Sequence, residues 1–480
     1  MGGSESKGSD HKATLHFPEE EKPLVIQLFY RISHGKKYFT REEFRHFSHS
    51  ALDLIVADRL FDFFLSGKHH QRSGHAEGEV DHHQFVNQLA FILKGGVQEQ
   101  AHMFCALCSP SQPQISSESL LEFVCSMVHS YEKILAAHCR EFQSWMLSHS
   151  NDNCRGLALY MIEDIFYAGD PKDKGFHQVS VPMQQTFSVE DIEAWLNKSS
   201  IFQQLFTGIF RSCFPLDETH AAEVVQFYPR IPQVRDTNWS AVSTILNLSS
   251  VLFLNACLPS VLQGEWRLIF SSSHFGSSFS LLLKHLLGKG LTLLVIKDRD
   301  GFVFGGFASQ PWNLDPKFYG TDENFLFRLH PNFGIFRPTG LNKNFMYLNI
   351  NTQTLPNGLG MGGQLNYFGL WIDQSFDKGC SKAEPRCTTY GSPQLSSKPD
   401  FQVDTVEVWL VGPVKKKEED DEDEDMTEEE KQMRGKSVLD RELESKAMLE
   451  LMGRPQVSEG IREEDTTQDG PEASKVISLF

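Results

Sequence analysis

The stretch from Trp266 to Trp409 constrains the fold most, because short apolar runs alternate with turn residues along its whole length. The runs are rich in β-branched and aromatic residues, and Gly, Pro, Asn and Asp recur between them. This spacing is typical of many short strands joined by tight turns. The expected strands are 266–270, 291–296, 302–307, 324–329, 333–336, 346–350, 369–372 and 401–410.

Two local signals indicate how parts of this stretch are arranged. Asp298-Arg-Asp-Gly301 separates the runs 291–296 and 302–307, and an Asp-Gly turn between such runs predicts a hairpin. Residues 279–287 are apolar at helical spacing and precede Gly288, which predicts a single internal helix. Many strands, frequent turns and one helix together predict two packed antiparallel sheets.

An ordered set of motifs within residues 241–413 resembles the TLDc domain family. No single motif is specific, whereas the whole set occurs in order and with ordinary gaps. The resemblance implies an α+β fold here, with a two-sheet β-sandwich and flanking helices. The matching positions are Trp266, Ser271, His274, Gly276, Gly305, Gly320, Gly362, Gly363 and Glu407.

Residues 17–232 carry a weak internal repeat of another kind. In each copy an apolar residue precedes Thr, Asp or Ser, and an amphipathic stretch follows directly. A Thr, Asp or Ser at that place caps the start of a helix. The spacing is that of the short β-segment and exiting helix of an EF-hand, so we expect an EF-hand-like helical domain. The four copies lie at Phe39-Thr40, Val80-Asp81, Ile115-Ser116 and Phe187-Ser188.

The first two copies lack the calcium ligands of an EF-hand. A functional loop needs oxygen ligands at its first, third and fifth positions and a carboxylate at its twelfth. We therefore expect helix pairs that pack without calcium, and a calcium-regulated switch is an alternative. The four positions hold Ile32, His34, Lys36 and Glu43 in the first copy, and Ser73, His75, Glu77 and Gln84 in the second.

Neither the cysteines nor the histidines of this half predict a metal site. Cys105 and Cys108 form one C-x-x-C pair, and a structural zinc site needs two further ligands at matching spacing. We expect both to be buried thiols. The remaining candidates lie in or beside a Gly-rich polar loop that fixes no geometry, so we expect no metal and no cofactor. These are His69, His70, His75, His82 and His83.

Composition excludes other classes of protein. The net charge of −18 over 480 residues counts against bulk binding of nucleic acid. Nine scattered cysteines and no secretory segment favour reduced thiols and the cytoplasm. The most apolar run, 244–262, is interrupted by Asn247, Asn255 and Pro259, so we expect a buried helix there and no membrane span.

The first residues predict a lipid anchor. Met1-Gly-Gly-Ser-Glu-Ser6 fits the pattern for N-myristoylation of Gly2, and residues 1–16 are expected to form a disordered acceptor arm. A single myristoyl chain holds a protein only weakly at a bilayer, so we expect a second attachment through a protein partner.

The last residues predict a tethered helix. An acidic run within the linker 414–426 is expected to stay disordered, as are residues 454–480. Between them, 427–453 has a capping box, an apolar stripe and a closing Gly453. The helix either folds back on the sheets or docks in a partner's groove, and the tether favours the partner. The stripe contains Leu439, Leu443, Met448, Leu451 and Met452.

Two patterns invite an enzymatic interpretation. Ser271, His274 and a carboxylate, Asp298 or Glu407, suggest a triad, but no G-x-S-x-G elbow is present and the first two lie in one turn. Glu407 has the outward phase of an alternating strand, or else is a buried hydrogen-bond anchor.

Lys382 and Arg386 lie near Cys380 and Cys387, and neighbouring cations can lower a thiol pKa. We expect ordinary loop cysteines and no enzyme, with a redox or hydrolytic enzyme as the alternative.

The family resemblance carries the remaining functional expectations. TLDc proteins are implicated in oxidation resistance, and relatives bind the vacuolar-type proton ATPase. The resemblance therefore implies a non-enzymatic adaptor on the cytoplasmic face of the lysosomal membrane and in the cytoplasm. Its implied partners are the peripheral sector of that ATPase and components of the mTOR pathway.

Overall fold

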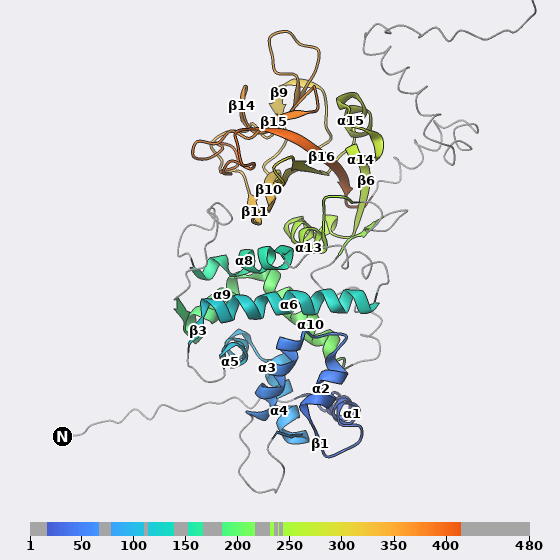
Figure 1. Cartoon of the computed structure of the whole chain (residues 1–480), viewed down its shortest axis with the longest axis vertical. Helices are drawn as coiled ribbons and strands as arrows, with labels where there is room; N and C mark the ends of the chain where they lie inside the picture. The colour runs from blue at the N-terminus through green and yellow to red at the C-terminus, as the bar shows by residue number, and fades with distance from the viewer. Residues whose placement is uncertain are drawn as a thin grey trace, which may run out of the picture. The chain divides into compact units, whose positions relative to one another are not determined.

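The computed structural model describes residues 17–66, 78–109, 114–138, 152–166, 185–216, 231–234, 239 and 243–413 (Figure 1). They belong to one compact unit that ends at Val414, and Lys415–Phe480 form a second unit. Several predictions lie outside the described residues. These are the arm 1–16 with Gly2, the linker 414–426, the helix 427–453 with its stripe Leu439, Leu443, Met448, Leu451 and Met452, and the tail 454–480.

The helical region comprises the described residues from 17 to 216. Its helices are α1 (Lys22–Ile32), α2 (Arg41–Ser48), α3 (Leu54–Leu65), α4 (His82–Lys94), α5 (Val97–Cys108), α6 (Ser117–His138), α8 (Asp152–Phe166), α9 (Val189–Lys198) and α10 (Ser200–Cys213). Four two-residue strands lie among them: β1 (Tyr38–Phe39), β2 (Val80–Asp81), β3 (Ile115–Ser116) and β4 (Thr186–Phe187).

The predicted repeat has a structural counterpart in all four copies. Each short strand leads into a helix, and the strands pair antiparallel two by two, β1 with β2 and β3 with β4. Thr40, Asp81 and Ser188 form complete capping boxes at the starts of α2, α4 and α9. These reciprocal bonds satisfy two backbone groups that a helix start leaves unpaired.

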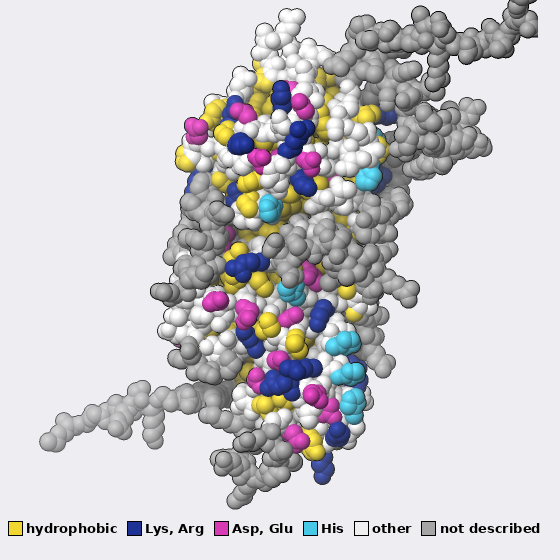
Figure 2. Space-filling view, viewed as in Figure 1, with side chains coloured by type: hydrophobic (Ala, Val, Ile, Leu, Met, Phe, Trp, Pro, Cys, Tyr) yellow, Lys and Arg dark blue, Asp and Glu magenta, His cyan; other side chains and the backbone are white. Residues whose placement is uncertain are grey.

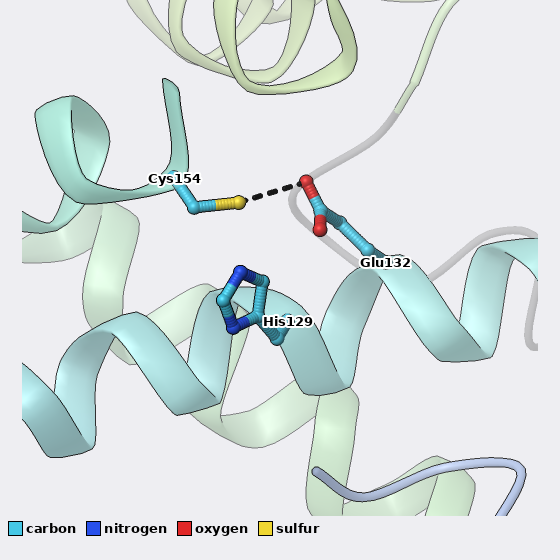
Figure 3. A group of neighbouring side chains, drawn as sticks. All are labelled: His129, Glu132 and Cys154. Carbon is cyan, nitrogen blue, oxygen red and sulfur yellow. Dashed lines mark hydrogen bonds between the residues drawn. The ribbon is translucent and has the colours of Figure 1, made fainter. Parts of the chain in front are cut away.

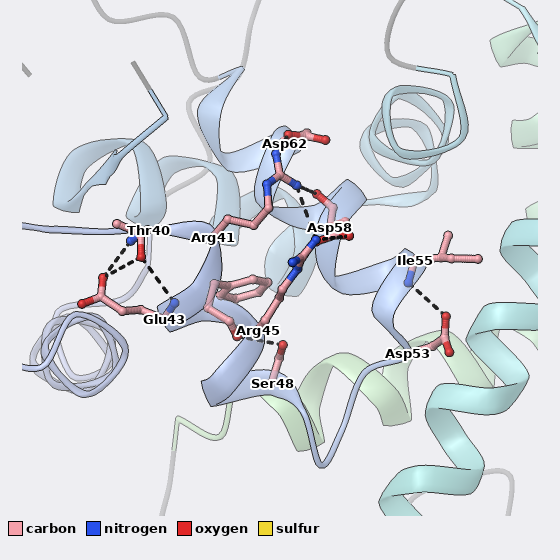
Figure 4. Close-up of polar contacts among 10 residues, drawn as sticks. Thr40, Arg41, Glu43, Arg45, Ser48, Asp53, Ile55, Asp58 and Asp62 are labelled. Carbon is pink, nitrogen blue, oxygen red and sulfur yellow. Dashed lines mark hydrogen bonds and ion pairs between the residues drawn. The ribbon is translucent and has the colours of Figure 1, made fainter. Parts of the chain in front are cut away.

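In the first copy, side chains at two of the calcium-ligand positions bind each other. The Lys36 ammonium lies 2.6 Å from Oε1 of Glu43, so the fifth and twelfth positions pair with each other. The second oxygen of Glu43 accepts the backbone N–H of Thr40 at 2.8 Å (Figure 4). Arg45 donates to both carboxylate oxygens of Asp58, at 2.6 and 2.7 Å, and joins α2 to α3.

The β-rich region comprises the described residues from 231 to 413. Its helices are α13 (Leu248–Cys257), α14 (Ser272–Phe275) and α15 (Phe279–Leu286), with a 3-10 turn at Ser260–Leu262. Its strands are β5 (Gln233–Val234), β6 (Glu265–Ser271), β7 (Thr292–Asp298), β8 (Val303–Ala308), β9 (Asp315–Tyr319), β10 (Phe325–His330), β11 (Gly334–Phe336), β12 (Met346–Asn349), β13 (Gly358–Gln364), β14 (Tyr367–Asp373), β15 (Lys378–Cys380) and β16 (Asp400–Val411).

This arrangement confirms the α+β fold and corrects the prediction of two separate sheets. The strands form one hydrogen-bonded path, because β16 pairs with β15 at its start and with β6 and β7 further along. Two layers still meet, since a Cβ added to Gly306 on β8 would lie 2.4 Å from the sulfur of Met361 on β13. The predicted hairpin is confirmed as β7 and β8, and the predicted helix as α15.

Helix α13 is buried along its length, which confirms the prediction for 244–262. It contacts α8 of the helical region, and Figure 1 shows α8 between α6 and α13. Phe253 of α13 packs edge-on against Tyr160 of α8 and Phe333 of the β-rich region, with ring centroids 4.8 and 5.0 Å apart. A single apolar core therefore runs through both regions. Among the described residues, no helix combines the length and apolar character needed to cross a bilayer.

Candidate functional site

Glu407 is the central buried anchor of the β-rich region. Its Oε1 accepts the backbone N–H of Thr244 at 2.7 Å, and its Oε2 accepts the Ser243 hydroxyl at 2.8 Å and the Trp409 indole N–H at 3.1 Å. Burial raises the pKa of Glu407, although these donors favour its charged form. The outward orientation is therefore wrong, and the alternative of a buried hydrogen-bond anchor is confirmed.

Three tryptophans surround this anchor. The rings of Trp239 and Trp409 stack at 5.0 Å, and Trp266 lies 5.7 Å from Trp239. Trp266 and Trp409 are fully buried, so the signature aromatics serve packing. They attach the chain entering the β-rich region to its central strands.

The residues of the suggested triad do not converge. Ser271 is fully buried at the end of β6, where it lies opposite Glu407 in the strand register. His274 is exposed on α14, and no hydrogen bond joins it to Ser271. Asp298 is buried at the hairpin, where it accepts the Phe302 N–H at 2.8 Å and the Ser396 hydroxyl at 2.6 Å.

The two cysteines proposed for redox chemistry are also buried. Burial raises the pKa of Cys380 to about 11 despite the nearby Lys382 ammonium, and burial raises the pKa of Cys387. The suggestion of lowered thiol pKa values is therefore wrong, because neither thiol is exposed enough for cations to offset desolvation. The prediction of buried thiols at Cys105 and Cys108 is confirmed.

The signature glycines follow two different requirements. Gly276, Gly320, Gly362 and Gly363 have φ values of 91°, 107°, 74° and 82°, a conformation that glycine adopts without strain. Gly305 differs, because a Cβ there would lie 1.8 Å from the carbonyl oxygen of Leu294 on the neighbouring strand. Gly362 and Gly363 both lie within β13.

Gly363 lies where three segments that carry exposed apolar side chains are hydrogen-bonded to one another. Asn344 donates to the carbonyl of Gly363 at 2.7 Å, and Thr389 accepts the Gly363 N–H at 2.8 Å. Thr389 also donates to Asn342 at 2.7 Å, so three segments are fixed to one another. These segments are 339–344, 362–367 and 387–391.

The three segments present Leu341, Leu365 and Tyr367, which we call the loop surface. Leu341 is 77% exposed, and Leu365 and Tyr367 are each 38% exposed. Apolar and aromatic side chains held on rigid loops are typical of protein-binding sites. Sequence reasoning missed this surface; the only local signal is an apolar residue inside a polar turn, as at Gly340-Leu-Asn342.

Charged side chains form no comparable site on the face of the molecule drawn in Figure 2. On the face drawn in Figure 2, Lys and Arg side chains are interspersed with Asp and Glu, without a large patch of one sign. A nucleic-acid interface requires such a basic patch. The loop surface is therefore our candidate site, and its chemistry suits a protein partner.

Comparison with known proteins places these observations in a family. The TLDc domain profile matches residues 239–412, close to the predicted 241–413. The Xenopus laevis protein named MTOR-associated protein MEAK7 is 33% identical over 474 residues, covering 96% of this chain and 98% of that protein. The Homo sapiens protein of the same name is 33% identical over 479 residues, covering 96% and 99%.

A shorter similarity extends to other TLDc proteins. Oxidation resistance protein 1 of Xenopus tropicalis is 36% identical over 180 residues, which cover 37% of this chain and 20% of that protein. The MEAK7 similarity, by contrast, spans the helical and β-rich regions alike. This chain therefore belongs to the MEAK7 family of TLDc-domain proteins.

Proposed function

We propose that this protein is a non-enzymatic, membrane-recruited adaptor that regulates mTOR-pathway signalling through the vacuolar-type proton ATPase. The observation that carries the proposal is similarity over almost the full length to proteins named for association with mTOR. The same similarity covers the helical region, so the proposal concerns the whole chain and not the TLDc domain alone.

The structural roles of the signature residues support the proposal that the protein is an adaptor. Trp266, Gly305 and Glu407 are committed to packing, close strand approach and hydrogen bonding inside the fold. A catalytic group must reach a substrate, whereas these side chains are enclosed. The exposed loop surface offers contact area instead.

The peripheral sector of the ATPase is the proposed partner because TLDc relatives bind that enzyme. The loop surface provides one proposed contact with the ATPase. The predicted tail stripe around Leu443 and Leu451 provides a second, and myristate on Gly2 adds weak membrane affinity. We place the protein on the cytoplasmic face of the lysosomal membrane and in the cytoplasm.

The first test substitutes the loop surface. Leu341→Asp combined with Leu365→Asp places two charges in the interface, and we expect recovery of the ATPase from lysosomal membranes to fall by about tenfold or more. Val261→Asp is the matched control, because Val261 is 74% exposed outside the three segments. Equal recovery with all these variants would remove the loop surface from the proposal.

The second test removes the tail. A chain ending at Pro413 retains the β-rich region, and we expect it to lose most of its ATPase affinity. Unchanged recovery would assign binding to the loop surface alone.

A third test addresses the lipid anchor. Gly2→Ala prevents acylation, and we expect less protein on lysosomes while binding to detergent-solubilised ATPase persists. Loss of both would show that Gly2 acts through the partner and not through the bilayer.

The helical region fits the proposal as an EF-hand-like packing module. Its short strands pair two by two. The Lys36 ammonium forms an ion pair with the Glu43 carboxylate, which is the group that calcium would bind. Titration calorimetry with calcium should therefore show no heat of binding. A measurable heat would favour the calcium-switch alternative.

A redox or hydrolytic activity remains the alternative for the β-rich region. Ser271→Ala, His274→Ala and Cys387→Ser should leave cellular protection against oxidants intact if the adaptor proposal holds. Loss of protection by a folded variant would favour the enzyme.

A further inference from the structure

Three side chains with metal-ligating atoms meet between α6 and α8, in the helical region. His129 and Glu132 lie three residues apart on one face of α6, and Cys154 lies in the first turn of α8. Their ligand atoms all lie within 4.8 Å of one another. Figure 3 shows the imidazole and the carboxylate both turned toward the sulfur.

The cluster is partly buried, and one of its polar atoms has no hydrogen-bond partner. The Cys154 thiol is buried and donates to Oε1 of Glu132 at 3.1 Å. Nε2 of His129 is buried and has no hydrogen-bond partner. A buried nitrogen without a partner is costly, and native proteins seldom leave one without a function.

The charges of the cluster match a divalent cation. A thiolate at Cys154 and a carboxylate at Glu132 carry two negative charges, and a neutral His129 adds none. A dication held by these three groups would therefore form a buried site of zero net charge, which avoids the large cost of burying unpaired charge. Nitrogen, oxygen and sulfur donors together are typical ligands of Zn²⁺.

Metal binding requires one proton to leave. Without a cation, the Cys154 thiol keeps its proton and donates it in a hydrogen bond to Oε1 of Glu132. When a dication binds, the S–H bond breaks, a metal–sulfur bond forms and the proton passes to solvent.

We propose that His129, Glu132 and Cys154 bind a divalent metal ion of the Zn²⁺ class. The fourth coordination position is open to water.

The location suggests a structural role. The hydroxyl of Ser249 on α13 lies 3.9 Å from the Cys154 sulfur, so the cluster adjoins the contact between the helical and β-rich regions. A metal here would fix α6 to α8 beside α13.

Co²⁺ is the probe for the test, because it substitutes for Zn²⁺ and reports on sulfur ligation by its absorption. The full chain, purified without a histidine tag and stripped with chelator, is titrated with Co²⁺. We expect one equivalent to produce the near-ultraviolet sulfur-to-cobalt band, and Zn²⁺ to remove it.

Cys154→Ser should abolish the band, and His129→Ala should weaken Co²⁺ binding by at least the roughly 10–100-fold that loss of a supporting partner costs. The matched control is Cys105→Ser with Cys108→Ser, two buried thiols on α5 outside the cluster, and it should retain the band.

Glu132→Gln keeps an acceptor for the thiol and provides a second measurement if Cys154→Ser does not fold. Zn²⁺ should raise the melting temperature of the native protein and not that of Glu132→Gln. Absence of the band in the native protein would overturn the proposal, as would a band that persists in a folded Cys154→Ser variant.

Discussion

The helical and β-rich regions share one apolar core. Two kinds of side-chain hydrogen bond, one inside each region, differ greatly in the sequence separation of the residues they join. In the helical region, the capping boxes link residues three apart, as Thr40 with Glu43 and Ser188 with Asp191. In the β-rich region, Glu407 bonds Thr244, which lies 163 residues earlier in the chain. The comparison teaches that local signals specify where the helices of the first region begin, whereas the anchor of the second region joins groups that only the folded chain brings together.

Two carboxylates make the contrast concrete. Glu43 is a cap whose side chain is 16% exposed, and its partners Thr40 and Lys36 are close in sequence. Glu407 is fully enclosed and accepts bonds from the distant segment at Ser243 and Thr244 and from Trp409 on its own strand. Loss of a cap disturbs one helix, while loss of a buried acceptor leaves several donors unpaired.

The largest effect should come from Glu407→Ala. Because it leaves a carboxylate-sized gap in the core and removes the acceptor of the Ser243 hydroxyl and of the Thr244 and Trp409 N–H groups, we expect a loss of about 3–5 kcal/mol in the free energy of unfolding. Urea denaturation followed by circular dichroism measures it. Asp404→Ala, exposed on the same strand, is the control and should change little.

If Glu407→Ala and Asp404→Ala proved equally stable, the bonds of Glu407 would contribute no more to the free energy of unfolding than an exposed side chain does. The comparison between the two regions would then fail.

Glu163→Gln tests whether the two regions depend on each other. Glu163 of α8 and Arg328 of β10 are both buried, and Glu163 favours the charged guanidinium, whose pKa burial lowers to about 10. Removing the carboxylate should cost about 3 kcal/mol, because it leaves a buried cation less well compensated.

Hydrogen exchange locates the consequence of Glu163→Gln. We expect amides of both α8 and β10 to lose protection, and Asp164→Asn on the same helix to be the milder control. Protection lost on one side only would show that the regions unfold independently.

Gly363→Ala should have an intermediate effect. Gly363 has φ of 82°, and a Cβ there would lie 2.1 Å from the carbonyl oxygen of Tyr367. We expect a loss of about 1–3 kcal/mol, together with weaker partner binding through the displaced loop surface. Gly264→Ala is the control, since a Cβ there meets no atom within 4 Å and its φ is ordinary. Unaltered stability of Gly363→Ala would show that the turn adapts.

The smallest effect should come from Asp58→Asn in the helical region. Hydrogen bonds from Arg45 lower the pKa of Asp58 below its ordinary value of 3.8. The ion pair therefore contributes stability above pH 3.8, and this contribution is lost as the pH falls through the lower folded-state pKa. The partly exposed pair is screened by solvent, so the effect is modest.

Melting temperatures of the native protein and Asp58→Asn should differ at pH 7 and converge below pH 3.8. In an Arg45→Gln background the difference should shrink to the part that Arg41 contributes, since Arg41 also lies 3.6 Å from the Asp58 carboxylate. A difference that is constant with pH would show that Asp58 acts by packing alone.

Strand β16 shows where sequence reasoning succeeds and where it stops. Its first residues alternate between exposed and buried, as the pattern predicts, but from Val406 to Val411 the strand is buried on both faces. The segment around Ser243 and Thr244 covers the second face, so the alternation that placed Glu407 outward no longer applied.

The sequence by itself determined the helix caps, the hairpin at Asp298–Gly301, helix α15 and most strands, because each depends on residues within a few positions of one another. Tertiary structure alone decided that one strand joins both layers, that Leu341 is exposed and that His129 and Glu132 meet Cys154. These features depend on which distant segments pack against a residue, and a local sequence pattern does not predict that packing.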